Sequence, residues 1–303
     1  VVHELLWFLK GDTNIQYLED NGVSIWTSDA YREYKKSFVP VGSETEPLSY
    51  EDFSRVVKSL KANIDPTTVP FQNNLTGKGW ELGPVYGAQW RRWRSNTKHK
   101  NSPEEFDDYV EFDQIQQVMD KLINNPDDRR IMVSAWNVAE IDKMALPPCH
   151  YGFQLYTEEL TILERMELRH RMTGEEIKKF ISPIGVEAMD REGVPTRRLS
   201  LIWDQRSCDT FLGIPFNIAS YGILLHMFAQ QANMVPDRLI GSLKNVHVYN
   251  NHIDQCNEQI AREPRELPKL VLNKAKDIFS YSYDDIKFIN YNPHNKITGS
   301  ISV

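Results

Sequence analysis

The sequence predicts an α+β fold in which a mixed β-sheet packs with helices. Stretches with the helical spacing of apolar residues are interspersed with short apolar runs that alternate as strands do. These elements follow no regular strand–helix–strand rhythm, and no repeat or low-complexity tract occurs. Of the 303 residues, 41% are hydrophobic and 25% are charged, which is typical of soluble globular proteins with a large core.

The chain opens inside an amphipathic helix. Residues 1–9 carry Leu5, Leu6 and Trp7 in succession, and the turn composition from Gly11 onward ends the helix. No methionine or polar segment precedes it, and it lacks the basic leader and small-residue cleavage site of a signal peptide. We therefore expect the natural chain to begin earlier.

Two stretches, at about 29–79 and 159–196, read as insertions in a single domain that spans 1–303. The first is rich in Tyr, Lys, Ser, Glu and Pro with weak periodicity, so we expect it to lie outside the core. In the second, the residues from Thr173 to Glu176 fit a capping box that opens a short charged helix.

The remaining pattern predicts helices and strands in turn. The spacing of apolar residues from Ile115 to Ile123 predicts a helix over about 104–124, which Asn125-Pro126 ends. Residues 131–136 read as a buried strand and 150–157 as a second strand. Further along, we expect a strand with Leu199, Leu201 and Trp203 alternating, a buried helix over 216–234, a strand over 246–249, a helix striped by Ile253, Cys256 and Ile260, and short strands and loops to Val303.

Charge, motifs and cysteines exclude several classes of function. The 35 Lys and Arg residues against 42 Asp and Glu give a net charge of −7, which argues against a protein whose main role is to bind DNA or RNA. The patterns GxGxxG, GxxxxGK[ST], HExxH and CxxC are absent, so neither a dinucleotide fold, a P-loop nor a zinc site is indicated. Apolar runs are too short and too broken by charge to span a membrane. Three cysteines are too few for a disulfide scaffold and favour a reducing compartment, the cytoplasm.

Cys149 is the first candidate for chemistry. It follows Pro147-Pro148, so its backbone is stiff. A thiol becomes a useful nucleophile when cationic neighbours lower its pKa, and Arg129, Arg130 and Arg206 are candidate neighbours. The alternative is a buried structural cysteine, the usual fate of a free thiol.

The segment from Gln205 to Asn217 is the second candidate. Arg206 and Ser207 follow a strand and offer a charged fork and a hydroxyl to a phosphate, while Asp209 offers a carboxylate to a donor-rich ring. The Asn217 amide presents a donor and an acceptor together. The alternatives are a surface ion pair between Arg206 and Asp209 and an N-cap role for Asn217.

Two further positions combine polar groups with an apolar context. His247 and Tyr249 are two residues apart on a predicted strand, so they share a face and could hold a sugar hydroxyl or be satisfied core residues. Glu4 lies on the apolar first helix, either on its polar face or in a functional site. Cys208 and Cys256 read as packing residues.

Taken together, long ordered motifs resemble the thymidylate synthase family. They cover about two thirds of the chain, and the gaps between them are the two insertions. The motifs are HELLWFLKGDTN (3–14), IW (25–26), LGPVYGAQWRRW (82–93), NPDDRRIMVSAWN (125–137), MALPPCH (144–150), QRSCDTFLGIPFNIASYG (205–222), HVYNNH (247–252) and REPRELPKL (262–270).

The resemblance implies that Cys149 is a nucleophile that adds to C6 of dUMP, so that C5 attacks the iminium form of 5,10-methylenetetrahydrofolate. Tyr86 then assists removal of the C5 proton, and Glu4 orders water near the pyrimidine O4 and the folate. Around the folate, the residues implied are Trp26, Leu146, the pterin contact Asp209 and the C-terminal Val303, which closes the site. No metal is implied.

For the nucleotide, the resemblance implies that Gln205, Arg206 and Ser207 bind substrate, the last two as a phosphate clamp. Asn217 reads uracil by accepting from N3–H and donating to O4, and His247 and Tyr249 contact the ribose 3′-hydroxyl. Arg129 and Arg130 correspond to a pair that reaches the neighbouring subunit's phosphate site. A homodimer through the sheet face is therefore implied.

Several positions depart from the family pattern. Lys244-Asn245 replace the usual Gly-Asp before the His-x-Tyr motif, Thr27 replaces an Asp after Ile-Trp, and Asp204 replaces a Tyr before Gln-Arg-Ser. The family's N-terminal segment, with a further phosphate-binding arginine, is absent from this chain.

Three functions are compatible with these residues. The first is thymidylate synthesis, in which a hydride from the folate reduces the one-carbon unit to give dTMP and dihydrofolate. The second is a dUMP 5-hydroxymethylase of the kind some phages use, in which water attacks instead and gives 5-hydroxymethyl-dUMP and tetrahydrofolate; the host cytoplasm would then be its location. The third is a non-catalytic member that binds nucleotide or RNA, against which the intact Cys149, Tyr86 and Glu4 argue. A cysteine hydrolase is disfavoured because no His and Asn or Asp partners are indicated for Cys149.

A substitution at Asn217 tests the expected base recognition. Asn217→Asp should relax the preference for dUMP toward dCMP, because a protonated carboxyl matches the donor and acceptor pattern of cytosine. Competition between the two nucleotides in a turnover assay measures this. An unchanged preference would contradict the assigned role of Asn217.

Overall fold

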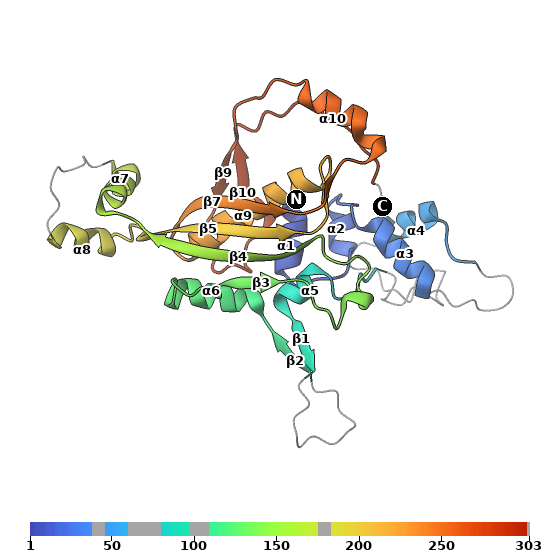
Figure 1. Cartoon of the computed structure of the whole chain (residues 1–303), viewed down its shortest axis with the longest axis horizontal. Helices are drawn as coiled ribbons and strands as arrows, with labels where there is room; N and C mark the ends of the chain where they lie inside the picture. Colours follow the sequence, from blue (N-terminus) through green and yellow to red (C-terminus); the bar gives the residue numbers. More distant parts are fainter. Residues whose placement is uncertain (38–45, 60–79, 97–108, 175–182, 302–303) are drawn as a thin grey trace, which may run out of the picture. The chain divides into compact units, whose positions relative to one another are not determined.

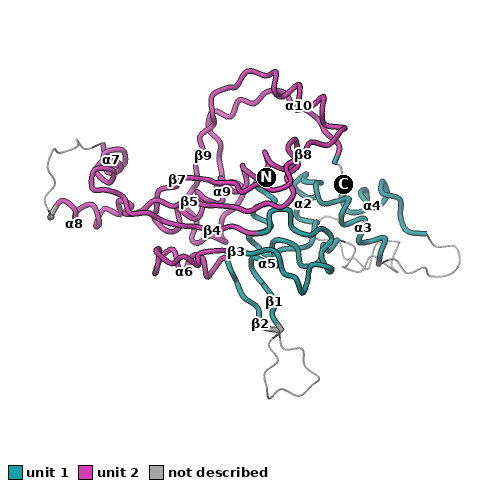
Figure 2. Tube along the Cα trace, in the orientation of Figure 1, with its two compact units in different colours: residues 1–114, 134–151, 301–303 teal, residues 115–133, 152–300 magenta. Residues whose placement is uncertain are grey.

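The computed structural model describes residues 1–37, 46–59, 80–96, 109–174 and 183–301, which fall into two compact units (Figure 2). Unit 1 comprises Val1–Gln114, Ser134–Tyr151 and Ile301–Val303, and unit 2 comprises Ile115–Val133 and Gly152–Ser300. Helices and strands are intermixed along the chain as expected for an α+β fold (Figure 1).

Unit 1 is mainly helical. Its elements are α1 (Val2–Leu9), α2 (Gln16–Asp20), α3 (Thr27–Ser37), α4 (Tyr50–Ser59), α5 (Tyr86–Arg91), the antiparallel pair β1 (Trp93–Asn96) and β2 (Tyr109–Phe112), and the 3-10 turn η2 (Ile141–Lys143). The predicted first helix is confirmed as α1, which buries Trp7 and Phe8. Helix α5 lies close to α1 and to the turn after it, because a Cβ at Gly87 would be 3.1 Å from the Phe8 carbonyl oxygen and 2.8 Å from that of Asp12.

The stretch expected to lie outside the core contributes to it. Ala30 and Tyr34 of α3 and Phe53 and Val57 of α4 are all buried. These side chains recur at helical spacing, but the surrounding Lys, Glu and Ser residues mask that period in the sequence. Residues 38–45 and 60–79 of the stretch lie outside the described residues, and its status as an insertion stays a prediction.

The helix expected over 104–124 begins later. Residues 104–108 lie outside the described residues, 109–112 form β2, and α6 spans Gln114–Asn124. Val110 and Phe112 favour a strand, since β-branched and aromatic residues fit a pleated surface. Four apolar residues of α6 are buried as expected, namely Ile115, Val118, Met119 and Leu122, but Ile123 is 59% exposed.

A four-stranded sheet runs in the order β3-β4-β5-β7. Its strands are β3 (Met132–Ser134), β4 (His150–Glu159), β5 (Arg197–Gln205) and β7 (Val235–Leu243), with β5 and β7 parallel. The predictions of β3, β4 and β5 are confirmed, whereas β7 was not predicted. Strand β3 is not buried throughout, because Met132 is 56% exposed while Val133 is buried.

Helix α9 (Gly213–Gln231) packs on this sheet within unit 2. Leu199, Leu201 and Trp203 alternate toward the core as predicted, and the Trp203 ring stacks on Tyr221 at 5.5 Å between centroids. On β7, a Cβ at Gly241 would lie 2.5 Å from the Trp203 ring, so only glycine leaves room for this indole. The prediction that the helix is buried all round is wrong at its start, where Phe216 is 53% exposed.

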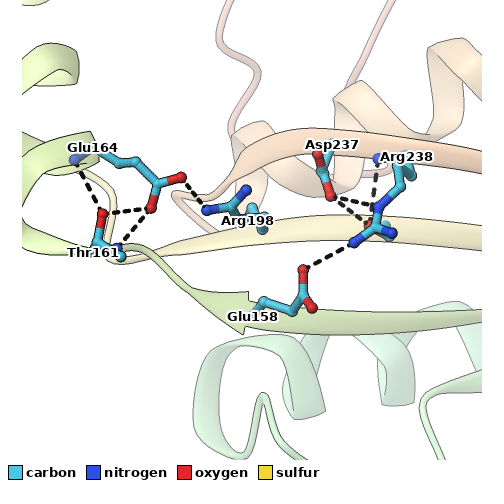
Figure 3. Close-up of polar contacts among 7 residues, drawn as sticks. Glu158, Thr161, Glu164, Arg198, Asp237 and Arg238 are labelled. Atoms are coloured by element: carbon cyan, nitrogen blue, oxygen red, sulfur yellow. Dashed lines mark hydrogen bonds and ion pairs between the residues drawn. The ribbon is translucent and has the colours of Figure 1, made fainter.

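The expected capping box at Thr173 is wrong. Thr173 is the last residue of α7 (Ile162–Thr173), which ends on left-handed Gly174, while Glu175 and Glu176 lie outside the described residues. A capping box instead opens α7, where Thr161 and Glu164 bond reciprocally (Figure 3). Bonds from Thr161, and then from Arg198, lower the pKa of Glu164 to about 2.

Charged side chains tie the ends of three strands together in the same region. Arg198 of β5 bonds Glu164, and Arg238 of β7 bonds both Asp237 and Glu158 of β4 (Figure 3). Beside them, α7 and α8 (Pro183–Arg191) share a small core of their own, formed by Met166, Met189 and Val194. These three side chains hold together the described part of 159–196, the second predicted insertion.

The rest of unit 2 consists of short elements. They are β6 (Cys208–Asp209), which pairs in parallel with β8 (Val246–His247), the 3-10 turns η3 (Asn250–His252) and η4 (Tyr283–Asp285), α10 (Ile253–Ile260), and the antiparallel pair β9 (Lys269–Leu272) and β10 (Ile286–Ile289). The predicted α10 is confirmed, but Ile253 and Ile260 on its stripe are exposed. Within the described ranges, no helix has the length and apolarity needed to cross a membrane.

Candidate active site

Cys149 lies at the entrance of β4, directly after the two prolines. Its side chain is half-buried, and its backbone N–H donates to the phenol oxygen of Tyr86 at 2.8 Å. Two segments 63 residues apart in the chain therefore meet at the predicted nucleophile and the predicted proton-transfer residue.

The loops that bring them together leave no room for a side chain. Gly83 has φ +71°, and a Cβ there would lie 2.0 Å from the Lys143 carbonyl oxygen. The Ala145 N–H donates to the Leu82 carbonyl at 2.8 Å, so the loop before Tyr86 and the loop before Cys149 are joined by backbone. Arg32 of α3 also donates to the Ala145 carbonyl, at 2.8 Å, so the first stretch read as an insertion supports the site.

Aromatic rings surround the Tyr86 phenol. Tyr86 stacks on His150 at 4.2 Å between centroids, lies 4.9 Å from Phe8 and meets Trp26 edge-on at 6.0 Å. A phenol held on three sides in this way can present its oxygen in only one direction.

Glu4 belongs to the same cluster. The Trp26 indole N–H donates to its carboxylate at 2.8 Å. Burial raises the pKa of Glu4, and this outweighs the bond from Trp26, which acts in the opposite direction. The Glu4 residue as a whole is half-buried, and its functional role stays a prediction.

His150 is a member of the site that the sequence did not single out. Burial lowers its pKa to about 3, so the imidazole is neutral near pH 7. Its position next to Cys149 in the sequence could have indicated that it belongs to the site. Its stacking on Tyr86 depends on the fold and cannot be read from the sequence. A neutral ring cannot stabilise the Cys149 thiolate by charge, so that role stays predicted for Arg129, Arg130 and Arg206, which belong to unit 2.

In unit 2, a buried amide orients the predicted base reader. The Asn217 Nδ2 donates to Gln205 Oε1 at 3.1 Å, and the Trp203 indole N–H donates to the same oxygen at 3.2 Å. Gln205 in turn donates to the Ser207 carbonyl at 3.0 Å. Because Gln205 Oε1 can only accept, it fixes which end of the Asn217 amide is the donor. The N-cap role for Asn217 is wrong, since Leu212 is the N-cap of α9.

Asp209 lies at the start of α9. Its carboxylate accepts backbone N–H bonds from Phe211, Leu212 and Gly213, each at 3.2 Å. These donors orient the carboxylate at the positive end of the helix dipole.

His247 and Tyr249 are adjacent, as expected. Their rings meet edge-on, with centroids 5.0 Å apart and an interplanar angle of 88°. The strand is shorter than predicted, because β8 ends at His247 and Tyr249 precedes η3. The His247 ring nitrogen Nδ1 bonds the Asn245 carbonyl at 2.8 Å, which fixes the ring beside Tyr249.

The remaining predicted residues differ in their exposure. Arg206 and Ser207 lie between β5 and β6 and are half-buried, whereas Arg129 and Arg130 are exposed before β3, Arg130 with 87% of its side chain accessible. Leu146 of unit 1 is half-buried, and Val303 lies outside the described residues. Cys208 is a packing residue as predicted, whereas Cys256 is only half-buried. In the described ranges, no three His, Cys, Asp or Glu side chains are placed to hold a metal ion.

Three of the residues that differ from the family pattern form hydrogen bonds or an ion pair in the structure. Lys244 bonds Asp204, so two of the departures form one ion pair across β5 and the end of β7. Asn245 adopts φ +43°, a left-handed conformation that asparagine tolerates better than most residues. The Thr27 hydroxyl donates to Glu19, which keeps this replacement buried and hydrogen-bonded.

Comparison with known proteins gives a consistent result. The family model described as thymidylate synthase matches residues 1–303. A thymidylate synthase of Corynebacterium aurimucosum is 37% identical over 303 residues, which cover 100% of this chain and 78% of that protein. A thymidylate synthase of Mycoplasma genitalium is also 37% identical, with 100% and 81% covered, and one of Mycoplasma mobile is 39% identical, with 100% and 81% covered.

The depressed pKa of His150 predicts a pH effect on stability. The unfolded chain takes up a proton near pH 6.5, whereas the folded protein takes it up only near pH 3. Stability should therefore fall as the pH is lowered from 6.5, by up to about 1.4 kcal/mol per pH unit from this residue. Urea unfolding of the wild type and His150→Phe at several pH values measures the difference. Equal slopes in the two proteins would contradict the buried neutral imidazole.

Proposed function

Because the chain belongs to the thymidylate synthase family, we propose that it methylates C5 of dUMP, with Cys149 as the nucleophile and the residues around it as proton carriers. Members of this family are one-carbon transferases, and this chain is such an enzyme. The bond from the Cys149 N–H to Tyr86 supports the proposal most directly, since it joins nucleophile and proton carrier.

The covalent step needs a thiolate. In the proposed reaction, the Cys149 sulfur forms a bond to C6 of dUMP, and the electron pair of the C5–C6 double bond makes C5 nucleophilic. Tyr86 then takes part in removing the C5 proton, with its phenol held by the rings of His150, Phe8 and Trp26.

Glu4 provides a proton reservoir in the same cluster. Burial raises its pKa above the ordinary value for a carboxyl group, which suits a group that exchanges protons at the pyrimidine O4 through water. Trp26 donates a hydrogen bond to Glu4 and, in this proposal, also lines the folate. The same residues of unit 1 would then contact both dUMP and the folate.

Base selection is assigned to Asn217. With Nδ2 already bonded to Gln205, the amide still has a second N–H for the uracil O4 and its carbonyl oxygen for N3–H. The proposed sugar contacts are His247 and Tyr249, and the proposed phosphate contacts are Arg206 and Ser207.

The one-carbon unit and the hydride are supplied by 5,10-methylenetetrahydrofolate in this proposal. Asp209, held by the first N–H groups of α9, offers a fixed acceptor to the donor-rich pterin. Trp26 and Leu146 line the folate, and Val303 closes the site. The location proposed is the cytoplasm, which rests on the number of cysteines.

Arg129 and Arg130 support a homodimer with shared sites. Both are exposed in the single chain, and the Arg130 guanidinium lies 3.9 Å from the Asp128 carboxylate. Two exposed guanidinium groups on consecutive residues suit a phosphate on another subunit better than a surface ion pair.

Product identity tests the proposed function. The protein is incubated with dUMP and 5,10-methylenetetrahydrofolate, and both products are identified by mass. We expect dTMP with dihydrofolate; 5-hydroxymethyl-dUMP with tetrahydrofolate would overturn the proposal. Cys149→Ser should abolish turnover, because a hydroxyl is a far weaker nucleophile. The matched change Cys256→Ser, at a half-buried position on α10, should leave turnover intact.

Subunit mixing tests the shared site. Cys149→Ser and the double change Arg129→Ala with Arg130→Ala should each be inactive, and denaturing and refolding them together should restore activity. A mixed dimer has one complete site, so random pairing should give about a quarter of the wild-type rate. No recovery on mixing would mean that the two arginines serve their own subunit.

A further inference from the structure

A buried histidine next to Asp209 has no role in the proposed reaction. His252 ends η3 and is fully buried, with 0% of its surface exposed. Its Nε2 bonds the Ser300 carbonyl oxygen at 2.7 Å. A carbonyl oxygen only accepts, so Nε2 carries the proton and holds the C-terminal segment in place.

The other ring nitrogen lacks a hydrogen bond. Nδ1 of His252 is buried without a hydrogen-bond partner, and it lies 4.0 Å from Oδ1 of Asp209. Buried polar atoms in proteins are nearly always bonded, so an exception next to a binding residue calls for a functional reason. Among the described residues, the Asp209 carboxylate accepts 3.2 Å bonds from three consecutive backbone N–H groups where α9 begins.

The C-terminal segment fits tightly against this ring. Asn251 donates to the Ser300 hydroxyl at 3.1 Å, and Gln255 donates to the Thr298 carbonyl at 3.4 Å. Between them, a Cβ at Gly299 would lie 2.6 Å from the Phe211 ring and 3.2 Å from His252 Nε2. Residues 298–300 are therefore docked in one arrangement, for which the glycine is required.

The imidazole also contacts rings on both sides. Its centroid is 5.1 Å from that of Phe211, which follows Asp209 in the chain, and 5.9 Å from that of Tyr249. All these residues belong to unit 2. The His252 ring thus lies between residues 298–300 and the Asp209 carboxylate. It also contacts Phe211, whose N–H is one of the donors that orient this carboxylate.

We propose that His252 is a positioning residue for the folate: it docks residues 298–300 through Nε2 and thereby fixes the surroundings of Asp209, toward which Nδ1 points. This rests on the proposed function, because Asp209 serves as the pterin contact. The nucleotide contacts Asn217 and Gln205 form their own bonded group, so they should not depend on His252.

Two substitutions of His252 test the roles of its two ring nitrogens separately. The amide of His252→Gln can reach the position of Nε2 and bond Ser300, whereas the shorter amide of His252→Asn cannot. We expect His252→Asn to raise KM for 5,10-methylenetetrahydrofolate at least about tenfold and leave KM for dUMP within about twofold, and His252→Gln to restore most of the loss. His294→Asn is the matched control, since exposed His294 also bonds a backbone carbonyl, that of Glu263 at 2.8 Å.

Hydrogen exchange of residues 298–300 gives a readout without turnover. His252→Asn should speed exchange there, and His252→Gln and His294→Asn should not. Equal rises in KM for both substrates, or failure of His252→Gln to restore the folate KM, would overturn the proposal. Absence of any wild-type turnover would contradict the proposed function, while the exchange experiment would still decide whether His252 docks the segment.

Discussion

Exclusion of water by the aromatic rings of unit 1 governs the chemistry of its functional groups. Phe8, Trp26 and Tyr86 form one continuous layer, and the titratable groups at its edge respond in opposite directions. The pKa of the acid Glu4 rises and that of the base His150 falls, so both groups are driven toward their neutral forms. In the proposed reaction, this environment suits proton transfer more than the binding of a charged group.

Unit 2 controls polar groups in a different way. The buried Gln205 side chain forms hydrogen bonds that orient its neighbours, including Asn217. The Asp209 carboxylate is oriented by backbone N–H groups where α9 begins. Both arrangements rely on donors whose positions are set by secondary structure. If these groups bind the base and the pterin as proposed, selectivity depends on backbone geometry more than on charge.

Helices and strands whose pattern depends on local spacing could be predicted from the sequence. Predictions were wrong or missing where contacts between distant segments determine which residues are buried. The alternation on β5 and the stripe of α6 were visible because each face repeats over many residues. The helices around Phe53 were missed, because their buried positions are surrounded by polar residues. Thr173 has the composition of a helix start but ends one, since Gly174 can adopt the left-handed conformation that a stop requires.

For the site, the motifs predicted which residues matter but not how they are held. The resemblance indicated Cys149, Tyr86 and Asn217, whereas the stacking of His150 and the orphaned nitrogen of His252 depend on segments far apart in the chain. The departures Asp204 and Lys244 seemed independent in the sequence, because strand pairing that places them together cannot be read from either segment alone.

The absent side chain at Gly241 links strand packing to nucleotide choice. A methyl group there would displace the Trp203 indole, the indole would lose its bond to Gln205, and Gln205 would no longer fix the Asn217 amide. With Asn217 in its proposed role, a substitution at a strand position remote from the base would change which pyrimidine is accepted. In evolutionary terms, discrimination between uracil and cytosine would then constrain the backbone of β7 as firmly as the proposed base reader itself.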